Sequence, residues 1–332
     1  MATPPTDLPV TYSDVTQAAQ VLAGVAVRTP LLESSALNEQ AGGRLLFKPE
    51  TLQVTGSFKF RGAYNHISRL DASVKKTGVL AYSSGNHAQG TAAAAHYCGT
   101  PALIVMPEDA PEVKKHGTAR WGAEIVSYDR YGTKTREDIA ARLAEDRGLN
   151  LVKPYDDRFI MAGQGTVGLE IMQQLSDRTL QADRVLIPCG GGGLTAGVAT
   201  AIKHHNPNAI IHTVEPAGFD DTARSLEFRA RQQADLTAKS FCDALLAPEP
   251  GQMTFQVNRR LCGTGLVVDD SEVATAMAAA FQHLKLVLEP GGAVGLAAAL
   301  SGRVPLDGLT VIVLSGGNVD PKVFSDVLQK CK

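Results

Sequence analysis

The sequence of 332 residues has little of what marks membrane, secreted or nucleic-acid-binding proteins. Its formal net charge is −2 and no basic cluster occurs, so it offers no attractive field for nucleic acid or an anionic membrane. No stretch approaches the roughly 18 to 20 apolar residues that cross a bilayer. The N-terminal segment has neither the basic nor the apolar part of a secretory signal. These absences predict a cytoplasmic protein whose partners are small molecules.

Cysteine is also scarce, and its positions are scattered. There is no C-x-x-C pair, which argues against both a disulfide framework and a zinc site. The thiols are therefore predicted to be reduced and structural. The five positions are Cys98, Cys189, Cys242, Cys262 and Cys331.

What the sequence does contain is a regular alternation of short apolar runs and amphipathic segments. The clearest examples are strands expected at residues 78–84, 101–107 and 123–128, and helices expected at residues 86–99 and 133–148. Apolar runs without strict alternation are typical of parallel strands that helices cover on both faces. We therefore predict an α/β protein with two open, doubly wound lobes.

Three glycine-containing loops follow apolar runs: "SSGNH" at 83–87, "CGGGGLTAG" at 189–197 and "LSGGN" at 314–318. In open α/β sheets, ligands bind beyond the carboxyl ends of the strands. The three loops are therefore expected to meet at one site. A further segment, residues 245–254, has the composition of a surface loop.

The four consecutive glycines of the second loop, residues 190–193, stand between a predicted strand and a predicted helix. Their backbone N–H groups are unshielded and can converge on a phosphate at the helix N-terminus. An alternative is a dinucleotide-binding turn, because the loop also fits G-x-G-x-x-A and Glu215 ends the next predicted strand. That alternative gives no role to the other two loops.

Lys59, in "GSFKFRGA", lies between two phenylalanines at a predicted helix start. The positive end of a helix dipole disfavours an ammonium group, so this position favours a neutral amine. Pyridoxal phosphate needs such a lysine, with which it forms a Schiff base, together with a phosphate-binding loop and polar groups around its ring.

Five segments occur in order along the chain: "GSFKFRGA", "SSGNHAQG", "GGGGLTAG", "EPGGAVGLAAAL" and "LSGGNVD", and the resemblance that they carry extends over about residues 15–325. In order and separation they resemble the fold-type II serine/threonine dehydratase and serine racemase family of pyridoxal-phosphate enzymes. The resemblance implies the tryptophan synthase beta-like fold, with a large cofactor-binding domain of residues 1–80 and 151–332 and a small domain of residues 81–150. It also implies a homodimer. The short segment after the last motif leaves no room for a regulatory domain, so an unregulated or catabolic enzyme is expected.

The activity that the resemblance implies is dehydration and deamination of a β-hydroxy amino acid such as L-threonine or L-serine, giving a keto acid and ammonia. Two alternatives stay within the family: a 3-hydroxyaspartate dehydratase, and a serine or aspartate racemase with dehydratase side activity. A non-catalytic ligand-binding relative is a third, which the intact lysine and loops disfavour.

The resemblance also assigns cofactor contacts. Lys59 would carry the cofactor and act as the base at the substrate Cα, and Phe58 would flank the ring. Asn86 would bond the ring hydroxyl, and Ser315 would face the pyridine nitrogen. The phosphate would be bound by Gly190, Gly191, Gly192, Gly193 and Leu194.

The substrate α-carboxylate would lie against the first loop, at Ser83, Ser84, Gly85 and His87. Ser83 and His87 would otherwise simply begin the following helix. In a racemase, Ser84 would act as a second acid or base on the opposite face of Cα. Arg136 matches a position that can approach the far end of a substrate, although composition alone favours a solvated helix face.

"VEPAGFDD" resembles a divalent-cation site of the racemase-like branch, which assigns the carboxylates of Glu215 and Asp221 and the carbonyl of Phe219 as ligands. Oxygen ligands suit magnesium or calcium. The alternative is that Asp220 and Asp221 only begin a surface helix. The chain departs from its relatives at Ala244, where they commonly have glycine, so substrate preference does not transfer directly.

Overall fold

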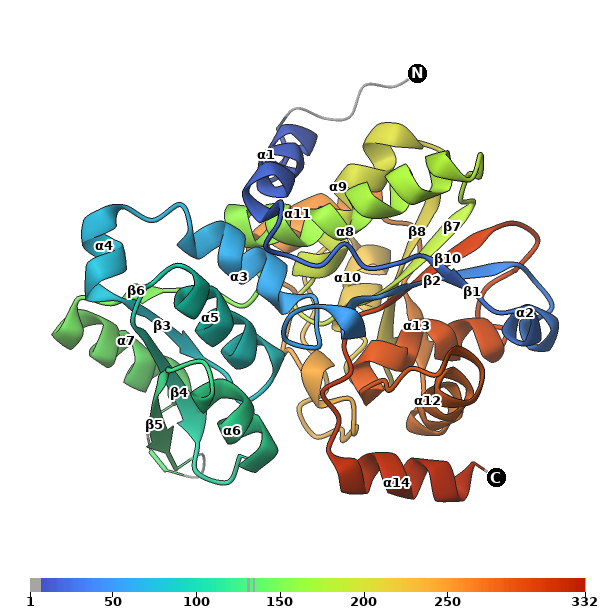
Figure 1. Cartoon of the computed structure of the whole chain (residues 1–332). Coiled ribbons are helices and arrows are strands. Elements are labelled where there is room, and N and C mark those ends of the chain that lie inside the picture. The colour runs from blue at the N-terminus through green and yellow to red at the C-terminus, as the bar shows by residue number, and fades with distance from the viewer. Residues whose placement is uncertain (1–6, 111, 130–131, 134, 332) are drawn as a thin grey trace.

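The computed structural model describes residues 7–110, 112–129, 132–133 and 135–331 (Figure 1). Its strands form two separate sheets, one of six strands and one of four. The larger has the order β1-β2-β10-β7-β8-β9, and β1 alone runs antiparallel to its neighbour. Its strands are β1 (Leu32–Glu33), β2 (Leu45–Pro49), β7 (Arg184–Pro188), β8 (Ile210–Pro216), β9 (Leu266–Val268) and β10 (Thr310–Leu314).

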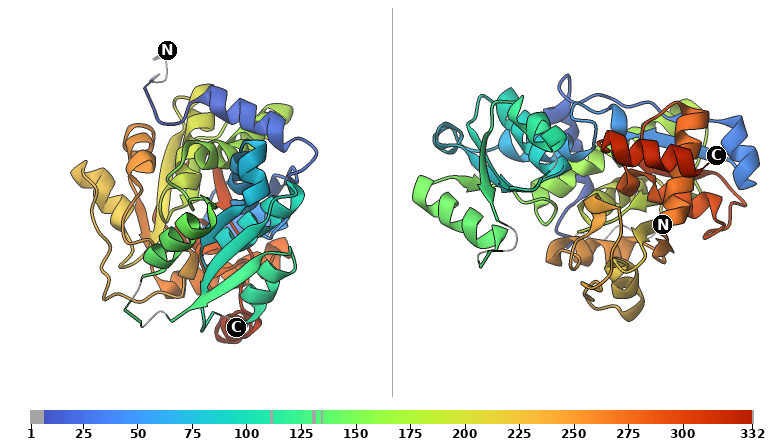
Figure 2. Two further views of the ribbon diagram at one scale, coloured as in Figure 1. Left: turned by 90° about the vertical axis from the view of Figure 1, so that its left-hand side faces the viewer. Right: turned by 90° about the horizontal axis from the view of Figure 1, so that it is seen from below.

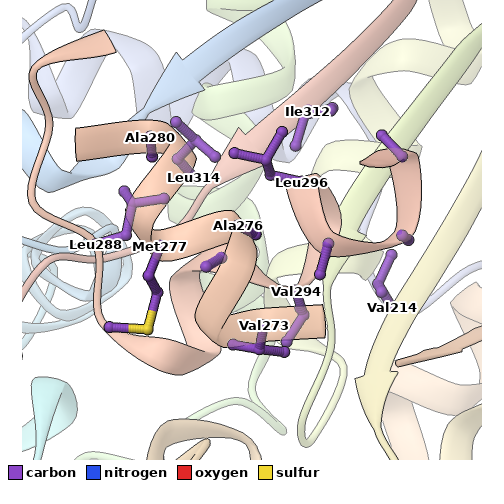
Figure 3. Close-up of a cluster of buried hydrophobic side chains, with 14 of the residues drawn as sticks. Val214, Val273, Ala276, Met277, Ala280, Leu288, Val294, Leu296, Ile312 and Leu314 are labelled. Atoms are coloured by element: carbon purple, nitrogen blue, oxygen red, sulfur yellow. The ribbon is translucent and has the colours of Figure 1, made fainter. Parts of the chain in front are cut away.

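Helices cover both faces of this sheet, because successive residues of its inner strands are apolar and buried on opposite sides. Phe47 and Ile312 point into one core cluster, whereas Leu46 and Val311 point into another. The first cluster is shown in Figure 3, where Leu296 of a covering helix lies beside Ile312. Its helices are α2 (Ser35–Ala41), α12 (Asp270–Leu284), α13 (Pro290–Leu300) and α14 (Pro321–Lys330). The other face carries α1 (Tyr12–Leu22), α8 (Arg158–Asp177), α9 (Gly193–His205) and α11 (Gln252–Leu261).

The smaller sheet is entirely parallel, with the order β5-β4-β3-β6. Leu80 and Ala81 of β3 are buried in different clusters, one formed with α7 and the other with α5. The elements of this region are β3 (Val79–Tyr82), β4 (Ala102–Pro107), β5 (Glu124–Tyr128), β6 (Asn150–Leu151), α4 (Ala72–Thr77), α5 (Asn86–Tyr97), α6 (Glu112–Ala119) and α7 (Arg136–Arg147).

Helix α3 (Lys59–Ile67) connects the two regions, because it packs against both α5 and α8 (Figures 1 and 2). Three short elements complete the description: η1 (Glu50–Leu52), α10 (Asp221–Phe228) and η2 (Asp243–Leu245). No helix in the described part of the chain is long and apolar enough to cross a membrane.

The predicted α/β class with doubly wound sheets is confirmed. The helix expected at residues 86–99 ends near Gly99, whose φ is +62°, and the helix expected at 133–148 begins only at Arg136. It starts there because Thr135 forms a capping box with Asp138. Lys134, within the expected range, lies outside the described residues.

The structure also bears on the expected loop at residues 245–254 and on the expected division into domains. The surface loop expected at residues 245–254 is wrong at both ends, since Leu245 is buried in η2 and α11 begins at Gln252. The predicted domain boundaries after residues 80 and 150 fall inside β3 and β6, which both pair within the smaller sheet. The division of the chain into these two domains stays a prediction.

Candidate active site

Lys59 is the first residue of α3, the helix that packs against α5 on one side and α8 on the other. Its Nζ donates a hydrogen bond of 2.7 Å to the carbonyl of Pro154 and stands 5.2 Å from the ring centre of Phe58. The amide of Phe58 donates to the carbonyl of Ser315, just after β10, over 3.2 Å. The "SFK" and "LSGG" segments are therefore adjacent, as the sequence predicted.

The surroundings of Lys59 favour its neutral form. Burial lowers the pKa of Lys59 to about 8, and the negative charge of Glu289 opposes that shift. The main cause is burial, not the helix dipole on which the sequence argument relied. Burial likewise raises the pKa of the Glu289 carboxyl to about 7. Lys59 can therefore lose its proton at mildly alkaline pH.

Asn86, at the start of α5, lies in a chain of side-chain amides and carboxyls. Its Nδ2 donates to Glu289 Oε1 over 2.5 Å, and its Oδ1 accepts from Asn318 Nδ2 over 2.7 Å. Asn318 also donates to the carbonyl of Thr55 over 2.8 Å. The sequence analysis gave no role to Glu289 or Asn318, although both lie inside quoted motifs, "EPGG" and "LSGGN". Asn86 is thereby held between three chain segments.

The glycine-rich loop joins β7 to α9 and can only be built from small residues. Gly192 has a φ of +89°, which favours glycine, and a Cβ on Gly191 would overlap the ring of Tyr155. A Cβ on Gly193 would lie 2.9 Å from Cβ of Tyr155. The loop therefore lies tightly against Tyr155, a residue that the sequence analysis did not identify.

The carbonyls of this loop are bound by α11 and the turn before it. Thr254 Oγ1 donates to the carbonyl of Gly191 over 2.7 Å, and Asn258 Nδ2 to that of Gly192 over 3.3 Å. Within the described residues, no amide from Gly190 to Leu194 donates to a protein acceptor outside its own helix. Free amides at a helix N-terminus fit the phosphate of pyridoxal phosphate.

Three of the five predicted substrate residues, Ser83, Ser84 and Arg136, line a small cavity at the end of β3, whereas Gly85 and His87 do not. Ser83 Oγ accepts a hydrogen bond of 3.2 Å from the amide of Gly85. The guanidinium of Arg136 lies 5.6 Å from the ring centre of Tyr82, and its Nε donates to Glu137 over 2.8 Å. The cavity of about 130 Å³ is lined by Ser83, Ser84, Val105, Pro107, Tyr128 and Arg136.

His87 points away from that cavity. The side chain is buried and its Nε2 lies 2.9 Å from the carbonyl of Val152. Burial, together with the charge of Lys59, lowers the pKa of His87 to about 3. The imidazole is therefore neutral and supplies no positive charge to a substrate carboxylate. Its role in substrate binding stays a prediction.

The residues predicted to bind a cation come together where β8 leads into α10. Both oxygens of Glu215 accept backbone amides, from Thr222 over 2.9 Å and from Ala223 over 2.7 Å. Asp221 is buried, and its Oδ2 has no hydrogen-bond partner among the described residues. Phe219 lies in the turn between them and is also buried.

Burial, assisted by Asp221, raises the pKa of Glu215 well above its usual value, and burial raises the pKa of Asp221 to about 7. Such carboxyls gain from a cation. The described residues hold no group of three or more His, Cys, Asp or Glu side chains suited to a metal. The predicted ligand set combines two carboxylates with a backbone carbonyl, and it stays a prediction. Asp220 and Asp221 do begin α10, as the alternative expected, although the side chain of Asp220 makes no cap bond and pairs instead with Arg224 at 3.3 Å.

Comparison with known proteins gives a consistent result. Residues 23–316 match the family described as "Pyridoxal-phosphate dependent enzyme". The chain is 40% identical to L-threo-3-hydroxyaspartate ammonia-lyase of Pseudomonas sp, covering 96% of this chain and 98% of that one. It is 39% identical to L-threonine ammonia-lyase of Thermotoga maritima, covering 97% and 79%.

Solved structures agree. Maize serine racemase superposes with a TM-score of 0.90 at 35% identity, over 97% of this chain and 98% of that one. Serine racemase from Dictyostelium discoideum superposes with a TM-score of 0.86 at 36% identity, over 94% and 99%. The chain therefore belongs to the fold-type II pyridoxal-phosphate dependent enzymes, in the family of serine/threonine dehydratases and serine racemases.

Proposed function

We propose that this chain catalyses the pyridoxal-phosphate dependent β-elimination of a β-hydroxy amino acid, such as L-threonine or L-serine, to a keto acid and ammonia. The observation that carries the proposal is a lysine with a lowered pKa, Lys59, bonded to Pro154 beside a loop of unshielded amides. The bound cofactor supplies an electron-withdrawing ring that stabilises negative charge developing at the substrate Cα.

The side chains around this position have separate tasks. Lys59 holds the cofactor through its amine and then removes the proton from the substrate Cα, for which its pKa near 8 is suited. Amides 190–194 bind the phosphate at the N-terminus of α9. Phe58 flanks the ring, and Asn86, held by Glu289, reaches toward the ring hydroxyl. Ser315 would face the pyridine nitrogen of the cofactor. Because its hydroxyl carries no negative charge, it would not stabilise a protonated ring nitrogen, so the ring would withdraw electrons less strongly and prompt loss of the β-hydroxyl group would be favoured.

The substrate binds at the N-terminus of α5. Ser83, Ser84 and Gly85 precede that helix, whose first-turn amides and dipole attract an α-carboxylate. His87 is neutral and contacts the carbonyl of Val152, which holds the first turn of α5 in place. The cavity beyond is small, which suits a short side chain and excludes most water.

A second candidate substrate is 3-hydroxyaspartate. The observation that favours it is Arg136, which lines the same cavity as Ser83 and Ser84. A guanidinium binds a second carboxylate well, because its planar fork matches the carboxylate geometry. The Pseudomonas relative is named for this substrate.

The test is a keto-acid release assay with threonine, serine and 3-hydroxyaspartate in each stereochemistry, on the parent and Arg136→Met. Loss of a charged hydrogen bond costs about 1.5 to 3 kcal/mol, so kcat/KM for 3-hydroxyaspartate should fall about 10- to 150-fold. Activity on serine and threonine should change less than about threefold. Arg142→Met, on the exposed face of the same helix, is the matched control. No keto acid from any substrate would refute the proposal.

We further propose that Glu215, Asp221 and the carbonyl of Phe219 hold a magnesium or calcium ion, with waters completing the shell. The support is the buried Asp221 Oδ2 that lacks a partner in the described structure. A homodimer, a cytoplasmic location and the absence of nucleic-acid and membrane partners are also proposals, which rest on the family resemblance and on the near-neutral charge.

A further inference from the structure

Arg61, two residues after Lys59 on α3, is a buried guanidinium with an unusual number of partners. Only 1% of its side chain is exposed. It binds Glu50 through Nε (2.7 Å) and Nη2 (2.9 Å). It also binds Glu170 through Nη1 (2.6 Å) and Nη2 (3.1 Å). One side chain thus holds two carboxylates in two-pronged contacts.

A second cation, Lys48, balances the charge of the second carboxylate. Lys48 Nζ, on β2, donates to Glu170 Oε2 over 2.6 Å and to the carbonyl of Thr29 over 2.7 Å. We call Lys48, Glu50, Arg61 and Glu170 the Arg61 cluster, which contains two cations and two carboxylates. A buried ion cluster is often no more stabilising than apolar residues of the same size. The stability of the fold alone therefore does not explain why this cluster is built from charged residues.

The cluster anchors α3 to α8 where the two backbones touch. A Cβ on Gly163 of α8 would lie 2.6 Å from Cα of Gly62. The amide of Gly62 donates to Gln164 Oε1 over 3.2 Å, and Asn65 Nδ2 donates to the carbonyl of Phe159 over 2.7 Å. Contacts this close permit little sliding between the helices.

The same pair of helices determines what Lys59 contacts. Its acceptor, the carbonyl of Pro154, lies just before the start of α8, and Glu170 lies within α8. Residues two apart on a helix point about 200° apart. Arg61 therefore projects from one side of α3 and Lys59 from the other. The partner of Arg61, Glu170, lies in α8, and the acceptor of Lys59, the carbonyl of Pro154, lies in the segment that leads into α8.

We propose that Arg61 is a positioning residue for Lys59: by binding Glu50 and Glu170 together, it fixes the rotation and height of α3 and hence the place of the Lys59 amine. This gives a reason for the arginine in "GSFKFRGA", to which the proposed function assigns no task. The inference rests on the proposed function insofar as Lys59 is the reacting lysine.

The test compares Arg61→Lys and Arg61→Met with Lys48→Met. Lys48 belongs to the same cluster and contacts the same Glu170, but it lies on β2 and leaves both two-pronged contacts of Arg61 in place. It is therefore a matched control for loss of one buried charge. Each variant is studied as the full chain, for urea unfolding, steady-state kinetics and the reactivity of Lys59.

Lys59 reactivity is measured on the cofactor-free chain by reductive methylation with formaldehyde across pH, with mass spectrometry of the Lys59 peptide. The parent should show a midpoint near pH 8. The charged and titrating groups that face this amine are Glu289 and His87, which no variant alters. Both Arg61 variants should move the midpoint toward the ordinary 10.5, because a displaced amine gains contact with water.

In the loaded enzyme, the Arg61 variants should lower kcat at least about tenfold with KM changed less than about threefold, since misplacement by about 1 Å can cost 100-fold. Lys48→Met should unfold at a lower urea concentration than the parent. Its pH midpoint of Lys59 labelling should equal that of the parent, and its kcat should stay within about threefold of the parental value. Arg61→Lys keeps the charge, so it serves as the test if Arg61→Met fails to fold.

If Arg61→Lys has the same kcat and the same pH midpoint of Lys59 labelling as the parent, the proposal is overturned. It is also overturned if Lys48→Met changes these two quantities as much as the Arg61 variants do. A parent that turns over none of the substrates would refute the proposed function instead. The labelling comparison would then still decide the role of Arg61.

Discussion

Replacing Gly191 by alanine tests whether the phosphate-binding loop depends on its packing against Tyr155. The added Cβ would overlap three atoms of the Tyr155 ring. Tyr155 also lies against Gly193, since a Cβ built there would be 3.1 Å from the Tyr155 backbone. Either the ring or the loop must therefore move. Gly190→Ala is the matched control, because its Cβ would lie 3.3 Å from Cα of Leu245, a tight but tolerable contact.

The magnitude follows from this geometry. Overpacking a buried site costs about 1 to 3 kcal/mol, whereas a contact that yields by a few tenths of an ångström costs less than about 1 kcal/mol. If movement of the loop removes one amide bond to the charged phosphate, a further 1.5 to 3 kcal/mol or so is lost from binding. Gly191→Ala should therefore bind pyridoxal phosphate about 10- to 150-fold more weakly than the parent.

Two measurements check this expectation. Urea unfolding of the cofactor-free chain reports the packing cost, and titration with pyridoxal phosphate, followed by visible absorbance, reports binding. Gly190→Ala should resemble the parent in both, since neither glycine has a positive φ that alanine would strain. Equal affinity and equal urea midpoints for the two variants would refute the reasoning.

Three further variants or treatments test the site. Lys59→Ala should lose both the visible absorbance of the bound cofactor and turnover, because the amine proposed to bind the cofactor is removed; full activity would contradict the mechanism. Dialysis against a chelator should lower thermal stability or activity, magnesium or calcium should restore it, and Glu215→Gln should not respond; an unaffected protein without metal by elemental analysis argues against the cation. Ser84→Ala should lose any racemisation, measured by chiral chromatography, and keep substantial dehydration; a parallel loss of both would make Ser84 a binding residue.

Features set by local sequence could be predicted here. The ends of α5 and α7 follow from Gly99 and Gly148, whose φ values of +62° and +64° favour glycine. The three glycine-containing loops do follow β3, β7 and β10, because an apolar run followed by glycines is itself a local signal. The phosphate-binding loop belongs to this class.

Contacts between distant segments could not be predicted. Asn86 and Glu289 are 203 positions apart, and Arg61 and Glu170 are 109 apart. Nothing in the pattern around either partner identifies the other, since the packing of whole helices and strands brings them together. The sheet to which residues 150–151 belong could not be predicted for the same reason: β6 has only two residues, and only its pairing with β3 places it in the smaller sheet.

The place of β10 in the larger sheet has a consequence for how the enzyme is made. This strand lies between β2 and β7, although it is the last strand along the described chain. Until residues 310–314 leave the ribosome, β2 and β7 each keep one unpaired edge, and such edges attract other strands. Ser315 and Asn318 emerge later still. The larger sheet, and with it the candidate site, can therefore close only after β10 has been synthesised, and two strand edges stay open until then.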